Sequence, residues 1–158
     1  MSVEHVREYL TQFGAQDRIL EFDVSSATVE LAAQALHCEP CRIAKTLSFM
    51  AGEQPVLIVA AGDCRIDNRR YKDCFGVKAK MMTAEELERF TGLQFGGVCP
   101  FGIPEGVDIY LDESLRRFDV VFPAAGTAAS AVRLTVPELE RAVQNFAGWV
   151  DIAKGWQA

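Results

Sequence analysis

The stretch IAKTLSFM (residues 43–50), followed by AGEQ and then PVLIVAA (residues 55–61), is the strongest fold signal in this sequence. In residues 43–50 the side chains alternate between two faces, which is the period of a β-strand. Residues 55–61 are almost continuously apolar, as expected of a buried strand. The short polar connection predicts a turn, so the two strands form a β-hairpin.

Helical patterns flank this hairpin. Residues 2–13 form an expected amphipathic helix that Ser2 can cap, and residues 28–36 form a second helix with Thr28 near its start. A short helix is expected near residues 67–75, and a strand over residues 77–82. Two T-x-x-E capping boxes open the helices AEELERF and VPELERAVQNF. The remaining predicted elements are the strands RILEF, VDIYL, DVVFPA and SAVRLT and a short helix around residues 113–117.

The chain shows no linker, repeat or shift in composition. We therefore predict one mixed α+β domain over residues 1–158, with about seven strands and no long alternation of strand and helix. The longest apolar run, Val56–Ala61, is far shorter than the roughly 20 residues of a membrane span. Charges near the N-terminus argue against a signal peptide. Five cysteines cannot all pair with one another, so we expect a cytoplasmic protein with reduced thiols.

The net charge of −6 argues against general affinity for nucleic acid, but one segment is basic. Residues 65–80 contain only two acidic side chains, Asp67 and Asp73, and six basic ones. Such a segment can be an ordinary solvated helix face, or it can direct an anionic ligand to one side of the protein. The basic residues are Arg65, Arg69, Arg70, Lys72, Lys78 and Lys80.

A C-x-x-C pair, Cys38 and Cys41, precedes the hairpin and raises the question of redox or zinc chemistry. Thioredoxin-type pairs lie between a strand and the helix that follows it, whereas here a helix precedes the pair and a strand follows. A structural zinc site normally needs a second closely spaced pair, and the other cysteines are scattered. We therefore interpret both residues as incidental, partly buried thiols.

Lys45 lies in the apolar run after this pair. Strand alternation places it on one face with Leu47 and Phe49, where an unpaired ammonium would be costly to bury. Two interpretations remain open. Lys45 can extend to water from an edge strand, or it can hold an anionic group in a cleft.

The stretch FGGVCPFGIPEG (residues 95–106) is rich in glycine and proline and predicts a loop. Backbone N–H groups in such a loop can point at a carbonyl oxygen or a phosphate, although most glycine-rich connections are simply turns. The two histidines, His5 and His37, are not placed like the base of a catalytic triad, and no G-x-S-x-G or H-E-x-x-H motif occurs. A hydrolase of this sequence would work without the usual nucleophile and base.

Together these pieces resemble the YbaK/EbsC-type aminoacyl-tRNA editing family, which is also found as the editing domain of bacterial prolyl-tRNA synthetases. The resemblance covers nearly the whole chain, and its most specific parts are the K-T-L strand and the G-x-x-x-P loop. The matching pieces, in the family's order, are TVELAAQAL, IAKTLSF, PVLIVAAGDCRID, TAEELERFTG, FGGVCPFGIP, VDIYLDESL and FPAAGTAASAVRLTVPEL.

The resemblance implies a partly barrel-like mixed sheet flanked by helices. It also implies hydrolysis of the ester between a wrong amino acid and its tRNA, typically tRNA for proline carrying alanine or cysteine. Lys45 would hold the terminal adenosine and the acyl group, and the loop Gly96, Gly97, Val98, Cys99 and Pro100 would face the scissile carbonyl. The substrate-binding residues would be Thr46, Phe101, Gly102, Gly126 and Ser130.

The implied partners are the acceptor end of aminoacyl-tRNA, which the basic segment would steer, and prolyl-tRNA synthetase. No metal, organic cofactor or membrane is implied, and the oligomeric state stays open. Cys99 replaces a common serine, and Thr46 replaces the asparagine of many alanine-specific relatives, so the amino acid removed does not carry over. The leading hypothesis is a stand-alone trans-editing deacylase. The alternatives are a non-catalytic tRNA- or nucleotide-binding module on the same fold and, more remotely, a thiol-redox protein.

Overall fold

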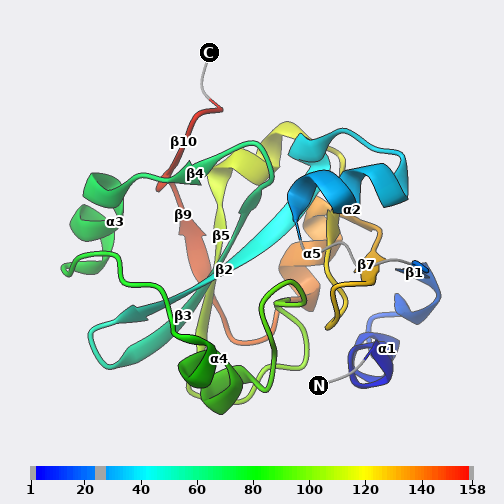
Figure 1. Ribbon diagram of the computed structural model, residues 1–158, viewed down its shortest axis with the longest axis horizontal. Helices are drawn as coiled ribbons and strands as arrows, with labels where there is room; N and C mark the ends of the chain where they lie inside the picture. The colour runs from blue at the N-terminus through cyan, green and yellow to red at the C-terminus, as the bar shows by residue number, and fades with distance from the viewer. Residues whose placement is uncertain (1–2, 24–27, 157–158) are drawn as a thin grey trace.

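One mixed six-stranded sheet forms the centre of the computed structural model, which describes residues 3–23 and 28–156 (Figure 1). Its strands follow the order β8-β6-β2-β3-β5-β9. β2 and β3 pair antiparallel around the turn at Gly52, so the predicted hairpin is confirmed. The strand bounds are β2 (Ile43–Ala51), β3 (Gln54–Ala61), β5 (Asp108–Asp112), β6 (Val120–Pro123), β8 (Leu134–Thr135) and β9 (Phe146–Val150).

The strands around the hairpin make the sheet mixed. β5 runs parallel to β3, β9 runs parallel to β5, and β6 runs parallel to the start of β2. Two small antiparallel pairs extend the structure, one of β1 (Ile19–Glu21) with β7 (Ser130–Val132) and one of β4 (Arg65–Ile66) with β10 (Ala153–Lys154). The result is a curled half-barrel flanked by helices, which confirms the predicted α+β fold class.

The helices begin and end where the sequence signals lie. Thr28 caps α2, Asp67 caps α3, and both predicted capping boxes form, at Thr83 with Glu86 and at Thr135 with Glu138. The cap expected from Ser2 lies outside the described residues. No helix within residues 3–23 or 28–156 is long and apolar enough to cross a membrane. The bounds are α1 (Val3–Thr11), α2 (Val29–Leu36), α3 (Asn68–Phe75), α4 (Ala84–Thr91) and α5 (Val136–Ala142), with short 3₁₀ helices η1 (Gln16–Arg18), η2 (Pro40–Arg42) and η3 (Glu113–Arg117).

Apolar side chains on both faces of the hairpin are buried. Leu57 and Val59 of β3 belong to the larger core, which also includes buried side chains of α1, α4 and α5. Val56 and Ile58 point the other way, into a smaller cluster with Phe49 and the α3 residue Tyr71. α3 lies to the left of the hairpin in Figure 1, and α1, α2 and α5 lie to its right. The continuous apolar pattern of residues 55–61 follows from this burial on both faces.

Several sequence expectations differ from the structure. The described residues form ten strands where about seven were expected, and the expected strand SAVRLT is divided into β7, which pairs with β1, and β8, which pairs with β6. Residues 77–82 form no continuous strand and pair with β2 only through a bridge between Met81 and Phe49. The last helix ends at Ala142 instead of extending over residues 143–146, and residues 146–150 form β9. Asn145 adopts a positive φ of 53°, a conformation that asparagine tolerates well, and redirects the chain into this strand.

Candidate functional site

A cavity of about 310 Å³ lies beside one edge of β2. On this side β6 pairs with β2 at Ile43 and Ala44, and Met81 pairs with it at Phe49. Within the described part of the chain, residues 45–47 therefore have no strand neighbour on this side, whereas the carbonyl of Ser48 accepts a hydrogen bond from the backbone N–H of Met82. The cavity is lined by Thr28, Val29, Ala32, Leu36, Ile43, Ala44, Lys45, Thr46, Leu47, Ser48, Met81, Phe95, Gly96, Val98, Phe122, Ala124, Ser130 and Ala131.

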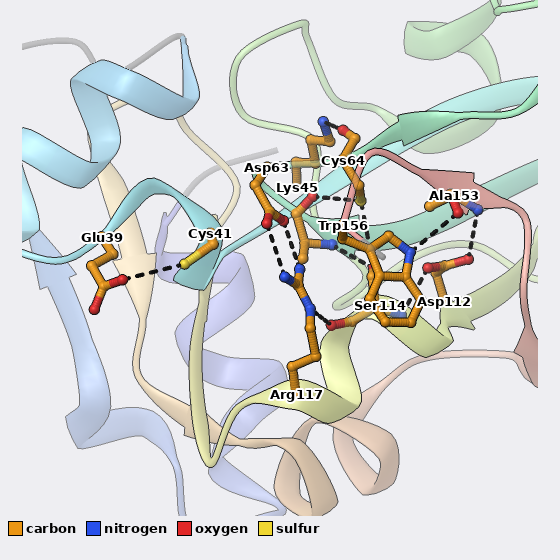
Figure 2. A network of polar contacts seen from close by, with 11 residues as sticks. Glu39, Cys41, Lys45, Asp63, Cys64, Asp112, Ser114, Arg117, Ala153 and Trp156 are labelled. Atoms are coloured by element: carbon orange, nitrogen blue, oxygen red, sulfur yellow. Dashed lines mark hydrogen bonds and ion pairs between the residues drawn. The ribbon is translucent and has the colours of Figure 1, made fainter. Parts of the chain in front are cut away.

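Lys45 is half-buried on β2 and lines this cavity. Its strand neighbours Leu47 and Phe49 pack with the cluster beneath α3, as the expected strand alternation requires. The Lys45 ammonium donates a hydrogen bond to the backbone carbonyl of Cys64, in the turn that follows β3 (Figure 2). A buried ammonium needs such a partner, so the lysine is held at the cavity wall by a backbone oxygen.

An ion pair lies directly beside this contact. Asp63 accepts two hydrogen bonds from Arg117, one of 2.9 Å from Nη1 and one of 2.6 Å from Nη2 (Figure 2). These hydrogen bonds lower the pKa of the Asp63 carboxyl, and the nearby charge of Lys45 lowers it further. Behind the Lys45 contact there is thus a further cation, Arg117, and a carboxylate that stays ionised at neutral pH, although neither residue lines the cavity.

The glycine-rich loop supplies another part of the cavity wall. Gly96 and Val98 line the cavity with Lys45, whereas Gly97 packs against residues 126 and 127. A Cβ atom at position 97 would lie 2.8 Å from the Cα of Thr127, so only glycine fits there without a shift of backbone. The structure therefore brings the lysine strand and the start of the G-x-x-x-P loop to one cavity, although they are about fifty residues apart.

Comparison with known proteins identifies the family. Residues 23–142 match the family described as the aminoacyl-tRNA editing domain. The chain belongs to this family. It is 46% identical over 158 residues to the uncharacterized protein YwhH of Bacillus subtilis (strain 168), a match that spans 99% of this chain and 100% of that protein.

Two further relatives of this editing domain are similar over different lengths. The proline–tRNA ligase of Levilactobacillus brevis is 27% identical over 95 residues, which are 60% of this chain and 16% of the ligase. A crystal structure described as a candidate trans-editing enzyme for prolyl tRNA synthetase superimposes with a TM-score of 0.86 at 29% identity, covering 98% of this chain and 99% of that one. The fold of the editing domain is therefore shared along nearly the whole chain.

The second half of the predicted loop lies away from the cavity of the editing domain. Cys99 is fully buried, and this burial raises the pKa of its thiol to about 12. Phe101 is also fully buried and packs near Tyr9, with ring centroids 6.4 Å apart. Gly102 contacts α1, since its carbonyl oxygen lies 3.1 Å from His5 Nε2. Pro100 is buried too, and its carbonyl oxygen accepts a hydrogen bond from the backbone N–H of Gln144.

The other predicted substrate-binding residues surround the loop and the strand. Thr46 lines the cavity, and its hydroxyl is buried with no hydrogen-bond partner among the described residues. Ser130 lines the cavity as well, with its Oγ 2.9 Å from Thr127 Oγ1. Gly126 lies instead at a smaller hollow of about 250 Å³, which Gly97 also lines.

The basic residues of segment 65–80 are all exposed, and they lie on different elements. Arg69, Arg70 and Lys72 belong to α3, and Arg70 also binds the carbonyl oxygen of Ala153 and the carboxylate of Asp151. Lys80 lies next to the cavity, because its carbonyl accepts a hydrogen bond from the β2 residue Met50 and its neighbour Met81 lines the cavity. Of the predicted tRNA-binding residues, Lys78 and Lys80 are therefore the ones that lie closest in sequence to a residue of the cavity, Met81.

Most of the residues that line the cavity, Phe95 and Met81 among them, were not predicted as site residues from the sequence. Phe95 and Met81 are large apolar side chains with exposed fractions of 52% and 54%, and both line the cavity. Phe95 is the first residue of the predicted loop and directly precedes the G-x-x-x-P motif, so its place in the sequence was an available signal. Met81 reaches the cavity only through its bridge to Phe49, a long-range contact that no local pattern indicates.

The C-x-x-C residues show no sign of activation. Cys38 and Cys41 are half-buried free thiols, and burial is the largest influence that raises the pKa of each. A reactive redox thiol needs a lowered pKa, so these environments oppose thiolate formation. This agrees with the interpretation of both residues as incidental.

Proposed function

We propose that this editing domain is a stand-alone trans-editing deacylase, which hydrolyses the ester between tRNA and a wrong, small amino acid. The observation that carries the proposal is the convergence of Lys45, Gly96 and Val98 on one cavity. The family membership supports an editing role, and the similarity to a candidate trans-editing enzyme supports action on tRNA for proline.

The chemistry needs little from protein side chains. Water attacks the ester carbonyl, the bond to the ribose oxygen breaks, and that oxygen leaves with a proton as the tRNA hydroxyl. Backbone N–H groups of Gly96 and Val98, the loop residues that line the cavity, would stabilise the oxyanion that develops during attack, and Lys45 would hold the terminal adenosine and the acyl group. An ester is activated enough for this without a protein nucleophile, which agrees with the buried, protonated thiol of Cys99.

The size and surroundings of the cavity fit the end of an acylated tRNA. A volume of about 310 Å³ is at the lower end for ligand pockets and suits a small acyl group with its ribose. Thr46 and Ser130 would contact the acyl group, and Lys78 and Lys80 would meet phosphates of the acceptor end. The role of Phe101, Gly102 and Gly126 would be to support the loop from behind.

The test is deacylation of tRNA for proline charged with alanine, cysteine, serine or proline. We expect wild type to release one small wrong amino acid and to spare proline. Lys45→Ala should lose at least about 10²-fold in kcat/KM, as expected when a positioned charge is removed from an active site. Lys154→Ala is the matched control, since that lysine lies on β10 and pairs with Asp67.

Two results would contradict the proposal. Equal rates for Lys45→Ala and Lys154→Ala would remove the lysine from the mechanism. No release of any of the four amino acids, with tRNA still bound by wild type, would favour the non-catalytic binding module on the same fold.

A further inference from the structure

We propose that the ion pair between Asp63 and Arg117 positions the Lys45 ammonium in the cavity, so that both are positioning residues for the deacylation. The inference rests on the proposed function, because positioning has meaning only if Lys45 acts on a substrate. Neither Asp63 nor Arg117 lines the cavity, so neither is placed to touch the substrate itself.

The first step concerns the lysine. A lysine ammonium sits on a flexible four-carbon stem, and its position is therefore defined by the partners it binds. The hydrogen-bond acceptor of Lys45 Nζ is the backbone carbonyl of Cys64 (Figure 2). A backbone carbonyl has no rotamers, so it moves only when the backbone of its turn moves. The position of the ammonium therefore depends on how firmly that turn is held.

The second step concerns the turn. Asp63 is the residue before Cys64, and its carboxylate accepts hydrogen bonds from both η nitrogens of Arg117, at 2.9 and 2.6 Å. The planar guanidinium matches a carboxylate in this two-bond geometry and fixes its orientation as well as its distance. Arg117 is itself held, because its Nε donates to the carbonyl of Ser114 at 2.9 Å and its guanidinium lies 4.7 and 5.1 Å from the rings of Phe118 and Trp156.

The third step separates positioning from folding. The start of the turn has other supports: the Ala61 N–H donates to Ser114 Oγ at 3.1 Å, and Gly62 packs so closely on Pro40 that a Cβ would lie 2.1 Å from its carbonyl oxygen. At Asp63, the side-chain hydrogen bonds that the structure shows come from Arg117. Cys64 is itself tied to Ala61, whose carbonyl accepts its N–H at 3.2 Å and its thiol at 2.9 Å. Loss of the pair should therefore loosen the Cys64 carbonyl without releasing it, while β3 and η3 stay in place.

The test compares two adjacent arginines of η3. Arg117→Met and Asp63→Asn remove the pair, and Arg116→Met is the matched control, because Arg116 instead pairs with Glu113 at 2.6 Å and stacks on Trp149. We expect kcat to fall about 10- to 100-fold in the first two variants, the loss typical of a misplaced active-site group, with affinity for uncharged tRNA unchanged. Arg117→Lys should have a higher kcat than Arg117→Met but a lower one than wild type, because lysine keeps the positive charge and cannot make the two parallel hydrogen bonds of a guanidinium.

A second measurement does not depend on catalysis. Trace acetylation followed by mass spectrometry reports how freely each lysine amine reacts, with Lys72 and Lys154 as internal references. Relative to these, Lys45 should be acetylated several-fold faster in Asp63→Asn and Arg117→Met than in wild type and Arg116→Met. Unchanged Lys45 labelling, or a fall in kcat that only follows a fall in Tm, would overturn the positioning role. If Lys45 labelling changes in the variants but wild type deacylates none of the substrates, the ion pair does position Lys45 and the proposed deacylase function is wrong.

Discussion

Position 97, where the glycine-rich loop packs against residues 126 and 127, has no room for a side chain larger than a hydrogen atom. A Cβ there would lie 2.8 Å from the Cα of Thr127 and 3.0 Å from the carbonyl oxygen of Gly126, both backbone atoms that cannot rotate away. We expect Gly97→Ala to lower the free energy of unfolding by about 1–3 kcal/mol and to reduce deacylation, because the loop must shift. Gly52→Ala is the control: it has open space but a φ of 67°, so only backbone strain of about 1 kcal/mol is expected. Urea unfolding checks both, and an equal cost would contradict the steric argument.

The two extremes of thiol exposure allow a second test at the scale of single residues. Cys74 is exposed, whereas Cys99 is fully buried with a pKa of about 12, and only the thiolate reacts with iodoacetamide. In the native protein at pH 8 we expect alkylation at Cys74 and none at Cys99, with Cys99 becoming reactive only in denaturant. Peptide mass spectrometry identifies the modified residue. Rapid native modification of Cys99 would mean that the loop opens and would make this thiol a candidate nucleophile.

Helix α4 depends on its N-terminal cap and leads directly into the loop of the site. Thr83 Oγ1 accepts the N–H of Glu86 at 3.1 Å, and the Glu86 carboxylate accepts the N–H of Thr83 at 2.9 Å. Thr83→Ala removes one of these two bonds, so we expect a loss of about 1 kcal/mol in the free energy of unfolding. Thr11→Ala is the matched control, since Thr11 at the end of α1 only bonds back to Arg7. An equal effect of the two substitutions on urea unfolding would show that the capping box contributes nothing measurable.

The elements that could be predicted from the sequence carry local signals. The hairpin over residues 43–61 shows strand alternation followed by a continuous apolar run, and each capping box lies within four residues. β9 could not be predicted, because its place in the sheet depends on parallel pairing with the distant β5, and Gly148 interrupts its pattern. The site divides in the same way. Lys45 and the glycine-rich loop are visible as unusual residue types, whereas Met81 reaches the cavity through a contact with Phe49 that only the folded chain creates.

At the scale of the whole molecule, the N-terminal region is fastened to α5 by an ion pair. Arg18 of η1 donates to the Glu138 carboxylate, and this hydrogen bond is the largest influence that lowers the pKa of Glu138 from 4.5 to about 2. A lowered folded-state pKa stabilises the protein above the unfolded value and loses its effect as the pH falls toward 2. We therefore expect Glu138→Gln to lower Tm at pH 7, with the difference from wild type closing between about pH 4.5 and pH 2. Glutamine retains the capping box, and Glu105→Gln on an exposed loop is the control. A Tm difference that stays constant down to pH 2 would contradict the charge argument.

The distribution of charge over the molecule predicts how tRNA binding depends on salt. The chain carries −6 overall, so affinity for a polyanion must come from a local surface, and Lys78 and Lys80 lie on the segment that reaches the cavity at Met81. Each phosphate contact made by these lysines releases counterions, so the double variant Lys78→Ala and Lys80→Ala should reduce the slope of log K against log salt by about 0.7 per lost contact. Lys154→Ala removes the same kind of charge on β10 and should leave the slope unchanged. Filter binding of tRNA at several salt concentrations measures the slopes. Equal slopes for wild type, the double variant and Lys154→Ala would mean that the acceptor end binds another face of the protein. A smaller slope for Lys154→Ala alone would mean that the acceptor end binds near β10.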